Sequence, residues 1–373
     1  MKNMRHLEVI KTYEKINPSL YYKIRSKNIE IQKKRREKFY FEKLKFPKEN
    51  FLNKTLIEFG CGSGQRSIVY NLWGAKSEHL DFEKKSILNA KKIFSKFGIK
   101  NKYKIKNLSI SDYKSTKKFD IVLSEGVIHH NINPYSNFKK ISKYLKKGGY
   151  LILGVGNSAG CFQRMLARYI IFKFSKDEKS IFKNSKYLFP DFLKRASKFS
   201  GRTVDETIND TFIIPIWKPT SSSTILKWFK KNKIKIFNAY PNFTQESFFG
   251  DSYLRDLDAY ANNSVKFVSE LIWMTHSKDD EEFTKYLDKN FVGSHSDLHK
   301  IINHVNGIEK NDKINEKMFS KDVKKFAKKI KKINFDLTEF HNLNSFFSEL
   351  DKLLRILNYE DIKKVKNFLQ KTK

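Results

Sequence analysis

The 373-residue sequence contains few of the residues that staple or interrupt small folds: two cysteines, seven prolines and fifteen glycines. Two cysteines cannot build a disulfide framework, and Cys61 and Cys161 lack the C-x-x-C spacing of a metal site. We therefore expect no metal site and a reducing, cytoplasmic location. No apolar run reaches the roughly 18 residues that span a bilayer. Residues 1–17 include Glu8 and Glu14 and no continuous apolar stretch, so we expect no signal peptide either.

Positive charge is what the sequence has in excess. It contains 75 Lys and Arg residues against 40 Asp and Glu residues, a net charge of +35, which would favour RNA or an anionic membrane as a partner. The lysines are spread from Lys2 to Lys373, however, and the abundance of Lys, Asn, Ile, Phe and Tyr is what an AT-rich genome would impose. We interpret most of this charge as solvated surface.

Short apolar runs alternate with helix-period segments between residues 55 and 155. This alternation is typical of βαβ units and predicts a Rossmann-like, doubly wound, mostly parallel sheet. The expected strands cover residues 55–59, 77–80, 103–105, 121–123 and 150–155. One expected helix places Ile87, Ala90, Phe94 and Phe97 on one face, and another does so with Phe138, Ile141 and Leu145. Gly148 and Gly149 are expected to end the second of these helices.

We divide the chain into a basic helical N-terminal segment over 1–50, a domain over 51–275 and a helical C-terminal extension over 276–373. The domain carries an inserted section at about 156–220, with a helix over 161–174 and loops leading to 208–212. After the insertion we expect a helix starting near Ser221 and a strand over 234–237. An apolar stripe over 346–357 in the extension is interpreted as packing.

A glycine-rich turn comes after the first expected strand, in the stretch from Leu56 to Gly64. Glycines at alternate positions let the backbone approach a ligand closely, at the strand end where doubly wound sheets bind nucleotides. A dinucleotide fingerprint would need a small residue where Gln65 stands. Glu58 would repel a pyrophosphate but attract an ammonium and a sulfonium group. The sequence therefore predicts bound S-adenosylmethionine, with these cofactor-binding candidates: Glu58, Gly60, Cys61, Gly62 and Gly64.

Two residues at the end of the second expected strand extend this site. Asp81 lies about 20 residues beyond the glycines, where a carboxylate accepts hydrogen bonds from the ribose hydroxyls. Phe82 can then lie against the adenine. The turn, the leading acid and the ribose acid occur together in one strand-helix-strand frame, which is a stronger signal than a glycine turn alone.

With the stretches 119–130 and 145–153, these motifs resemble the class I S-adenosylmethionine-dependent methyltransferase family over roughly residues 36–240. The resemblance implies a methyltransferase of the EC 2.1.1 class. It also implies that Ser124 and Glu125 lie beside the methionine moiety and that residues after the third strand lie near the adenine. The candidates there are Asn107, Leu108, Ser109 and Asp112, of which we favour Leu108 and Ser109.

Methyl transfer to a hydroxyl needs a base, and histidine has a suitable pKa. His129 and His130 come just after the fourth expected strand and are the catalytic candidates. The alternative is that one histidine hydrogen-bonds the turn while the other faces solvent. Asp210, in the inserted section, is a weaker candidate.

The residues directly after the fourth expected strand constrain the acceptor. Enzymes that methylate base amino groups place Asn/Asp-Pro-Pro-aromatic at this position, whereas this chain has Ser124 to Val127. We therefore expect a small-molecule or lipid-precursor acceptor, methylated on oxygen or carbon. The alternatives are an RNA methyltransferase, which we favour less, and a cofactor-binding scaffold without catalysis. The basic helix over 161–174 could roof the acceptor pocket or make peripheral membrane contact, but ordinary packing is the simpler interpretation.

Overall fold

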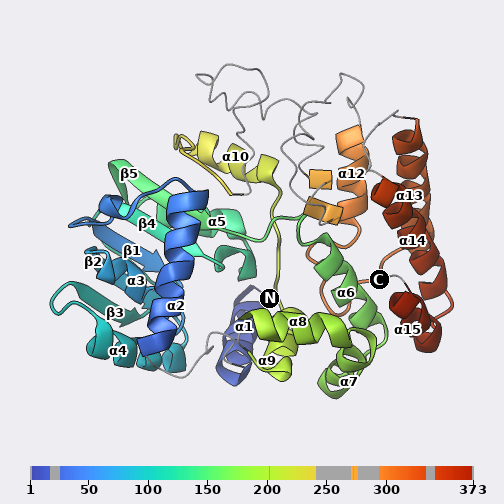
Figure 1. Ribbon diagram of the computed structural model, residues 1–373, viewed down its shortest axis with the longest axis horizontal. Coiled ribbons are helices and arrows are strands. Elements are labelled where there is room, and N and C mark those ends of the chain that lie inside the picture. Colours follow the sequence, from blue (N-terminus) through green and yellow to red (C-terminus); the bar gives the residue numbers. More distant parts are fainter. Residues whose placement is uncertain are drawn as a thin grey trace. The chain divides into compact units, whose positions relative to one another are not determined.

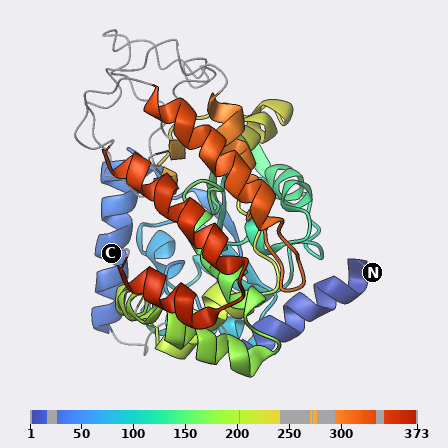
Figure 2. The ribbon, with the colours of Figure 1, turned by 90° about the vertical axis from the view of Figure 1, so that its right-hand side faces the viewer.

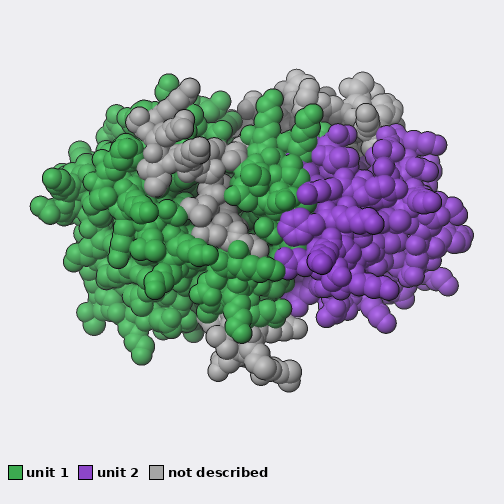
Figure 3. Space-filling view, turned by 90° about the horizontal axis from the view of Figure 1, so that it is seen from below, with its two compact units in different colours: residues 1–156, 194–220, 224–240 green, residues 157–193, 221–223, 241–373 purple. Residues whose placement is uncertain are grey.

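The computed structural model describes residues 2–16, 26–200, 202–240, 270–271, 273–275, 294–332 and 341–371 (Figure 1). The chain divides into two compact units, coloured separately in Figure 3. Unit 1 comprises Met1–Gly156, Lys194–Thr220 and Thr224–Tyr240, and unit 2 comprises Asn157–Leu193, Ser221–Ser223 and Pro241–Lys373.

Unit 1 is built on a five-stranded parallel sheet with the order β3-β2-β1-β4-β5. The strands are β1 (Thr55–Phe59), β2 (Lys76–Asp81), β3 (Tyr103–Asn107), β4 (Phe119–Glu125) and β5 (Leu145–Gly154). The strand order reverses between β1 and β4, and ligands bind beyond the carboxyl ends of strands at such a reversal. The Rossmann-like fold predicted from the sequence is confirmed.

Unit 1 also contains helices. They are α1 (Lys2–Ile16), α2 (Ser26–Glu37), the π-helical η1 (Lys38–Lys43), η2 (Lys48–Asn50), α3 (Ile68–Leu72), α4 (Lys84–Phe97), η3 (Ile128–His130), α5 (Pro134–Ser142), α9 (Val204–Ile208) and η4 (Asn209–Ile213). Two further helices, α8 (Pro190–Ser200) and α10 (Ser222–Lys231), begin in unit 2 and continue in unit 1. One apolar core joins η1, α3 and α4 to the sheet. A second core joins α5 and α10 to the opposite face.

Unit 2 is helical in its described residues. Its helices are α6 (Phe162–Lys173), α7 (Glu178–Leu188), α12 (Ser294–Asn303), α13 (Glu316–Lys331), α14 (His341–Leu357) and α15 (Ile362–Lys371). Figure 2 shows α13 and α14 side by side, with the Phe326 and Phe347 rings 4.9 Å apart. The apolar stripe of α14 is thus packing, as predicted. Across the described ranges, no helix has both the length and the apolar character needed to cross a bilayer.

Two predicted element boundaries are wrong near β5. Helix α5 ends at Ser142, and Leu145 to Gly149 belong to β5, so the glycine pair does not end a helix. The register against β4 shifts between Phe119 and Ile121. Gly148, at φ +74°, allows the extra residues of β5 to bulge there.

Two other predictions are also corrected. Residues 234–237 form no strand. The Phe237 ring contacts the Phe46 and Tyr150 rings beside β5, so side-chain packing takes the place of a hydrogen-bonded ladder. The stretch predicted as loops after α6 holds α7, α8 and α9 instead, and Asp177 and Thr203 form capping boxes at α7 and α9.

Candidate active site

The glycine turn after β1 adopts a backbone that only glycine tolerates well. Gly60, Gly62 and Gly64 have φ values of +84°, +53° and +77°. The amides of Gly60 and Cys61 donate to the Leu80 carbonyl at 2.7 and 2.9 Å, which ties the turn to β2. A Cβ on Gly60 would lie 2.2 Å from Val127 Cγ2. The turn is therefore held tightly between β2 and the loop after β4.

We predict that Gly60→Ala lowers the free energy of unfolding by about 2–5 kcal/mol, because strain at positive φ adds to the clash with Val127. Gly126→Ala is the matched control, since Gly126 has φ +76° and nothing within 4 Å of its Cβ position. It should cost only about 1–2 kcal/mol. Urea unfolding of both variants measures the difference. Equal losses would show that the approach of Val127 does not matter.

Asp81 ends β2 with both carboxylate oxygens oriented by the backbone. Oδ2 accepts from the Gly62 amide at 2.8 Å and Oδ1 accepts from the Glu83 amide at 2.9 Å. Each oxygen keeps a further lone pair that can accept a hydrogen bond from a hydroxyl group. Burial raises the pKa of Asp81 to about 6; the two amides lower this pKa, while nearby Glu83 and Glu58 raise it.

This pKa makes cofactor affinity dependent on pH. Ribose hydroxyls donate to the ionised carboxylate, so binding should lower the Asp81 pKa and release a proton below about pH 6. We predict that the dissociation constant falls about three- to tenfold between pH 5 and pH 7 and is flat above pH 7. Calorimetric titrations across this range, repeated with Asp81→Asn, measure the effect. A wild-type profile as flat as that of the variant would contradict it.

Glu58 is engaged within the sheet. Its Oε2 lies 2.7 Å from His79 Nδ1, and His79 Nε2 lies 2.8 Å from Ser77 Oγ. All three residues are buried. The role of Glu58 toward a cationic group of the cofactor stays a prediction, since its carboxylate contacts His79. Burial raises the pKa of the neighbouring Cys61 thiol well above its ordinary value, with Asp81 and Glu58 adding to the shift, so Cys61 is a neutral thiol.

The end of β3 is joined to Asp81 and Phe82. The Leu108 amide donates to the Asp81 carbonyl at 2.9 Å, and Asn107 Nδ2 donates to the carbonyls of Asp81 and Phe82 at 3.0 and 2.8 Å. Ser109 Oγ donates to Asp112 Oδ2 at 2.7 Å. Leu108 is thus held beside Asp81, whereas the Ser109 hydroxyl is engaged by Asp112. Both adenine contacts stay predictions.

A charged cluster surrounds Glu125 at the end of β4, beside the buried Ser124. Arg36 Nη1 lies 2.6 Å from Glu125 Oε2, Tyr40 Oη donates to Oε1 at 2.9 Å, and Tyr70 Oη donates to Oε2 at 3.3 Å. The Arg36 and Glu125 side chains are 10% and 13% exposed. Burial would raise the pKa of Glu125, but the Arg36 charge and the Tyr40 hydrogen bond lower it overall. Glu125 is therefore an ionised, oriented carboxylate.

The sequence motifs identified Glu125 but missed Arg36 and Tyr40. Both come from the basic N-terminal segment, Arg36 from α2 and Tyr40 from η1. The available signal was an arginine pair followed by three aromatic side chains over 39–41.

His129 and His130 carry their protons on different ring nitrogens. His130 Nδ1 lies 3.0 Å from the Ile216 carbonyl, which can only accept, so Nδ1 carries a proton; a neutral ring would then have its lone pair on Nε2. His129 Nδ1 accepts from the Gly156 amide at 3.3 Å, so its proton lies on Nε2. This tautomer of His130 is the one that a general base would need, and its catalytic role stays a prediction. The His129 carbonyl also accepts from the Lys218 amide at 2.7 Å, so His129 is bonded to the backbone through both its ring and its carbonyl.

Helix α1 brings one ring over this edge of the sheet. The Tyr13 ring lies 5.5 Å from Phe82 and 6.3 Å from His130. It thus joins the predicted ribose end of the site to the predicted base. The weaker candidate Asp210 is paired with Arg202 at 2.5 Å, so its carboxylate is engaged within the inserted section.

One protein-family model matches the part of the chain that contains the sheet, and known proteins are also similar to part of the chain. Residues 51–186 match a family model described as a methyltransferase domain. Over 106 residues the chain is 34% identical to a ubiquinone biosynthesis O-methyltransferase of Pelagibacter ubique, covering 28% of this chain and 43% of that protein. Over 109 residues it is 27% identical to a tRNA U34 carboxymethyltransferase of Wolinella succinogenes, covering 29% of this chain and 39% of that protein.

A solved S-adenosylmethionine-dependent methyltransferase from Clostridium acetobutylicum aligns with a TM-score of 0.29 at 21% identity. The alignment covers 31% of this chain and 49% of that one. The chain spans less than half the length of the two curated relatives it matches.

Proposed function

We propose that this chain, whose residues 51–186 form a class I S-adenosylmethionine-dependent methyltransferase domain, methylates a hydroxyl group on a small molecule or lipid precursor. The observation that carries the proposal is the 3.0 Å contact of His130 Nδ1 with the Ile216 carbonyl, because it leaves Nε2 as the basic nitrogen of a neutral ring. A hydroxyl acceptor needs such a base, because its proton must leave as the oxygen attacks.

The residues at the sheet edge fit the cofactor. The Gly60–Gly64 turn follows the carboxyl end of β1, where doubly wound sheets bind nucleotides, and Asp81 presents two oriented oxygens for a ribose. The amino-acid end of the cofactor carries one ammonium and one carboxylate, which match the charges of Glu125 and Arg36. When bound, S-adenosylmethionine supplies a methyl group made electrophilic by a sulfonium.

The protein contributes position and proton transfer. Aligning the acceptor oxygen removes much of the entropic barrier. His130 Nε2 takes the hydroxyl proton, and the Ile216 carbonyl then stabilises the imidazolium through Nδ1. The Tyr13 and Trp217 rings, 6.3 and 6.2 Å from the imidazole, provide an apolar surrounding that disfavours water.

One relative favours a hydroxyl acceptor, whereas the other relative and the net charge favour RNA. The Pelagibacter ubique relative is named an O-methyltransferase, which supports a hydroxyl acceptor. The Wolinella succinogenes relative is named for tRNA, and the net charge of +35 suits RNA. The basic side chains of this sequence are spread along its whole length, so we favour the smaller acceptor.

Transfer of labelled methyl groups tests the proposal. Full-length protein is incubated with methyl-labelled S-adenosylmethionine and three separate pools: small molecules, lipids and RNA. Label should enter the small-molecule or lipid pool, and the His130→Asn variant should transfer almost none. Label in RNA, with an affinity that falls steeply with salt, would replace the proposal with RNA methylation. Cofactor binding without transfer to any pool would favour the scaffold alternative.

A further inference from the structure

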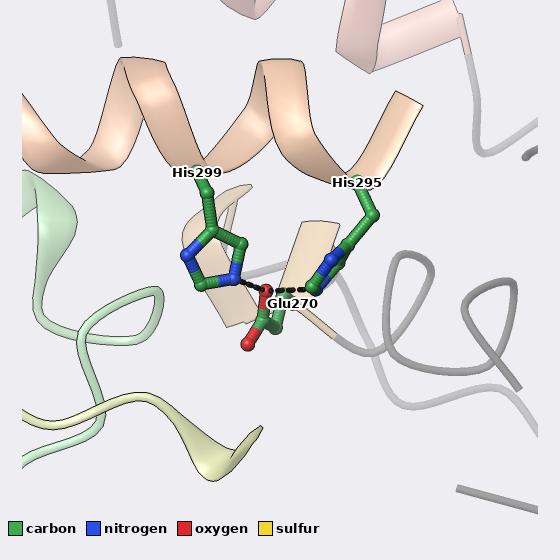
Figure 4. Close-up of side chains that lie close together, drawn as sticks. All are labelled: Glu270, His295 and His299. Carbon is green, nitrogen blue, oxygen red and sulfur yellow. Dashed lines mark hydrogen bonds and ion pairs between the residues drawn. The ribbon is translucent and has the colours of Figure 1, made fainter. Parts of the chain in front are cut away.

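Unit 2 contains a cluster of metal-ligating side chains that lies outside the candidate active site. His295 and His299 lie four residues apart on α12, so they project from the same side of the helix. Both rings point to Glu270 (Figure 4), which lies on another helical stretch. The Nε2 atoms of His295 and His299 lie 3.0 and 2.6 Å from the same carboxylate oxygen, Glu270 Oε2.

Three features distinguish this cluster from an ordinary ion pair. The ligand atoms of all three residues lie within 4.8 Å of one another. The Glu270 side chain is 0% exposed, while the two histidines are 18% and 23% exposed. Among the described residues, the second oxygen, Glu270 Oε1, has no hydrogen-bond partner although it is buried. A buried carboxylate oxygen without a partner is costly, and a cation would satisfy it.

The surrounding structure holds these ligands in place. Helix α12 buries Leu298, Ile301 and Ile302, and Asp297 pairs with Lys329 of α13. On the other side, Gln163 of α6 donates to the Met274 carbonyl at 3.2 Å, close after Glu270. The cluster therefore joins two helical elements that are each anchored independently. Such support keeps ligand geometry fixed before a metal arrives.

We propose that Glu270, His295 and His299 form a binding site for a divalent transition metal, with Zn²⁺ as the best match. Two imidazoles and one carboxylate are a ligand set that suits zinc, and metal bonds of about 2.0–2.2 Å would need the present contacts to open only slightly. Ser296 stands between the histidines at the position next to His295, where hydrolytic zinc sites on helices carry a glutamate base. Among the described residues the site has three protein ligands, and a bound metal would link α12 to the Glu270 stretch.

Zinc binding to the untagged full-length protein tests this proposal. After treatment with EDTA and dialysis, Zn²⁺ is titrated in competition with a chromogenic chelator. Wild type should bind about one equivalent, and His299→Ala should bind at least about a hundredfold more weakly. Removing a residue that only hydrogen-bonds to a metal ligand already costs about ten- to a hundredfold in affinity, and removing the ligand itself costs more. His304→Ala is the matched control, since His304 pairs with Asp322 in the same unit, 2.9 Å away.

Two further measurements keep the proposal testable if His299→Ala does not fold. The melting temperature should rise with Zn²⁺ for wild type and His304→Ala but not for Glu270→Gln. Co²⁺ added to wild type should give the visible absorption of a four- or five-coordinate site. Equal zinc affinity in wild type and His299→Ala, or wild type with no zinc bound at micromolar concentrations, would overturn the proposal. The cluster would then be a histidine-carboxylate pairing only.

Discussion

Replacing His130 by asparagine should slow methyl transfer by about two to four orders of magnitude, the usual contribution of a general base. Asparagine can still donate an amide proton to the Ile216 carbonyl, so the local contact survives while the Nε2 lone pair is lost. Cofactor affinity should stay within about twofold, because the change removes an interaction made only as the proton moves. Single-turnover rates together with calorimetric cofactor binding measure the two effects separately.

His129→Asn is the matched control for this prediction. Its amide oxygen can accept from the Gly156 amide as Nδ1 does in the wild type. We expect its rate to fall by no more than about threefold, since no base is lost. If the two variants lose activity equally, or if His129→Asn loses more, the assignment of the base to His130 is wrong.

Removing Arg36 should have the largest effect on stability. Arg36→Met leaves the Glu125 carboxylate buried without its countercharge, and breaking such a pair costs about 3–5 kcal/mol. Urea unfolding of the full chain measures this loss. Cofactor affinity should also fall, since we propose that Arg36 meets the carboxylate of the methionine moiety.

The pH dependence separates this explanation from simple loss of packing. In the wild type Glu125 has a lowered pKa, so the stability that it contributes is present above its ordinary pKa and is lost as pH falls. In Arg36→Met burial raises that pKa, so protonation on acidification relieves the penalty. The stability gap should therefore narrow as pH falls, first above and then below the ordinary glutamate pKa of about 4.3. The double variant Arg36→Met/Glu125→Gln should recover more than half of the loss at neutral pH, and a gap independent of pH would contradict this cause.

The sheet and its ligand turn could be predicted because their signals are local. Short apolar runs, such as those over 121–123 and 150–155, indicate buried parallel strands. Closely spaced glycines such as Gly60, Gly62 and Gly64 indicate a turn with unusual backbone angles. Asp81 could be placed from its position at the end of the next strand. Those predictions needed no knowledge of which distant segments meet.

The remaining features depend on contacts between segments far apart in the sequence. Arg36 reaches Glu125 across 89 positions, and nothing near either residue indicates the other. Glu270 and the two histidines meet only after unit 2 folds, although the four-residue spacing of His295 and His299 was visible. The strand predicted over 234–237 does not form, although its apolar residues alternate as in a strand. Its apolar side chains instead make ring contacts such as that of Phe237 with Phe46, which the local sequence does not reveal.

We propose that Asp81 and the glycine turn hold the ribose of S-adenosylmethionine. Calorimetric titration of that cofactor into wild type and Asp81→Ala at pH 8 tests this directly. We predict saturable one-to-one binding by the wild type, weakened by about 1–3 kcal/mol in the variant through lost hydrogen bonds to a charged group. Equal affinity in both proteins, or no binding by the wild type, would contradict it.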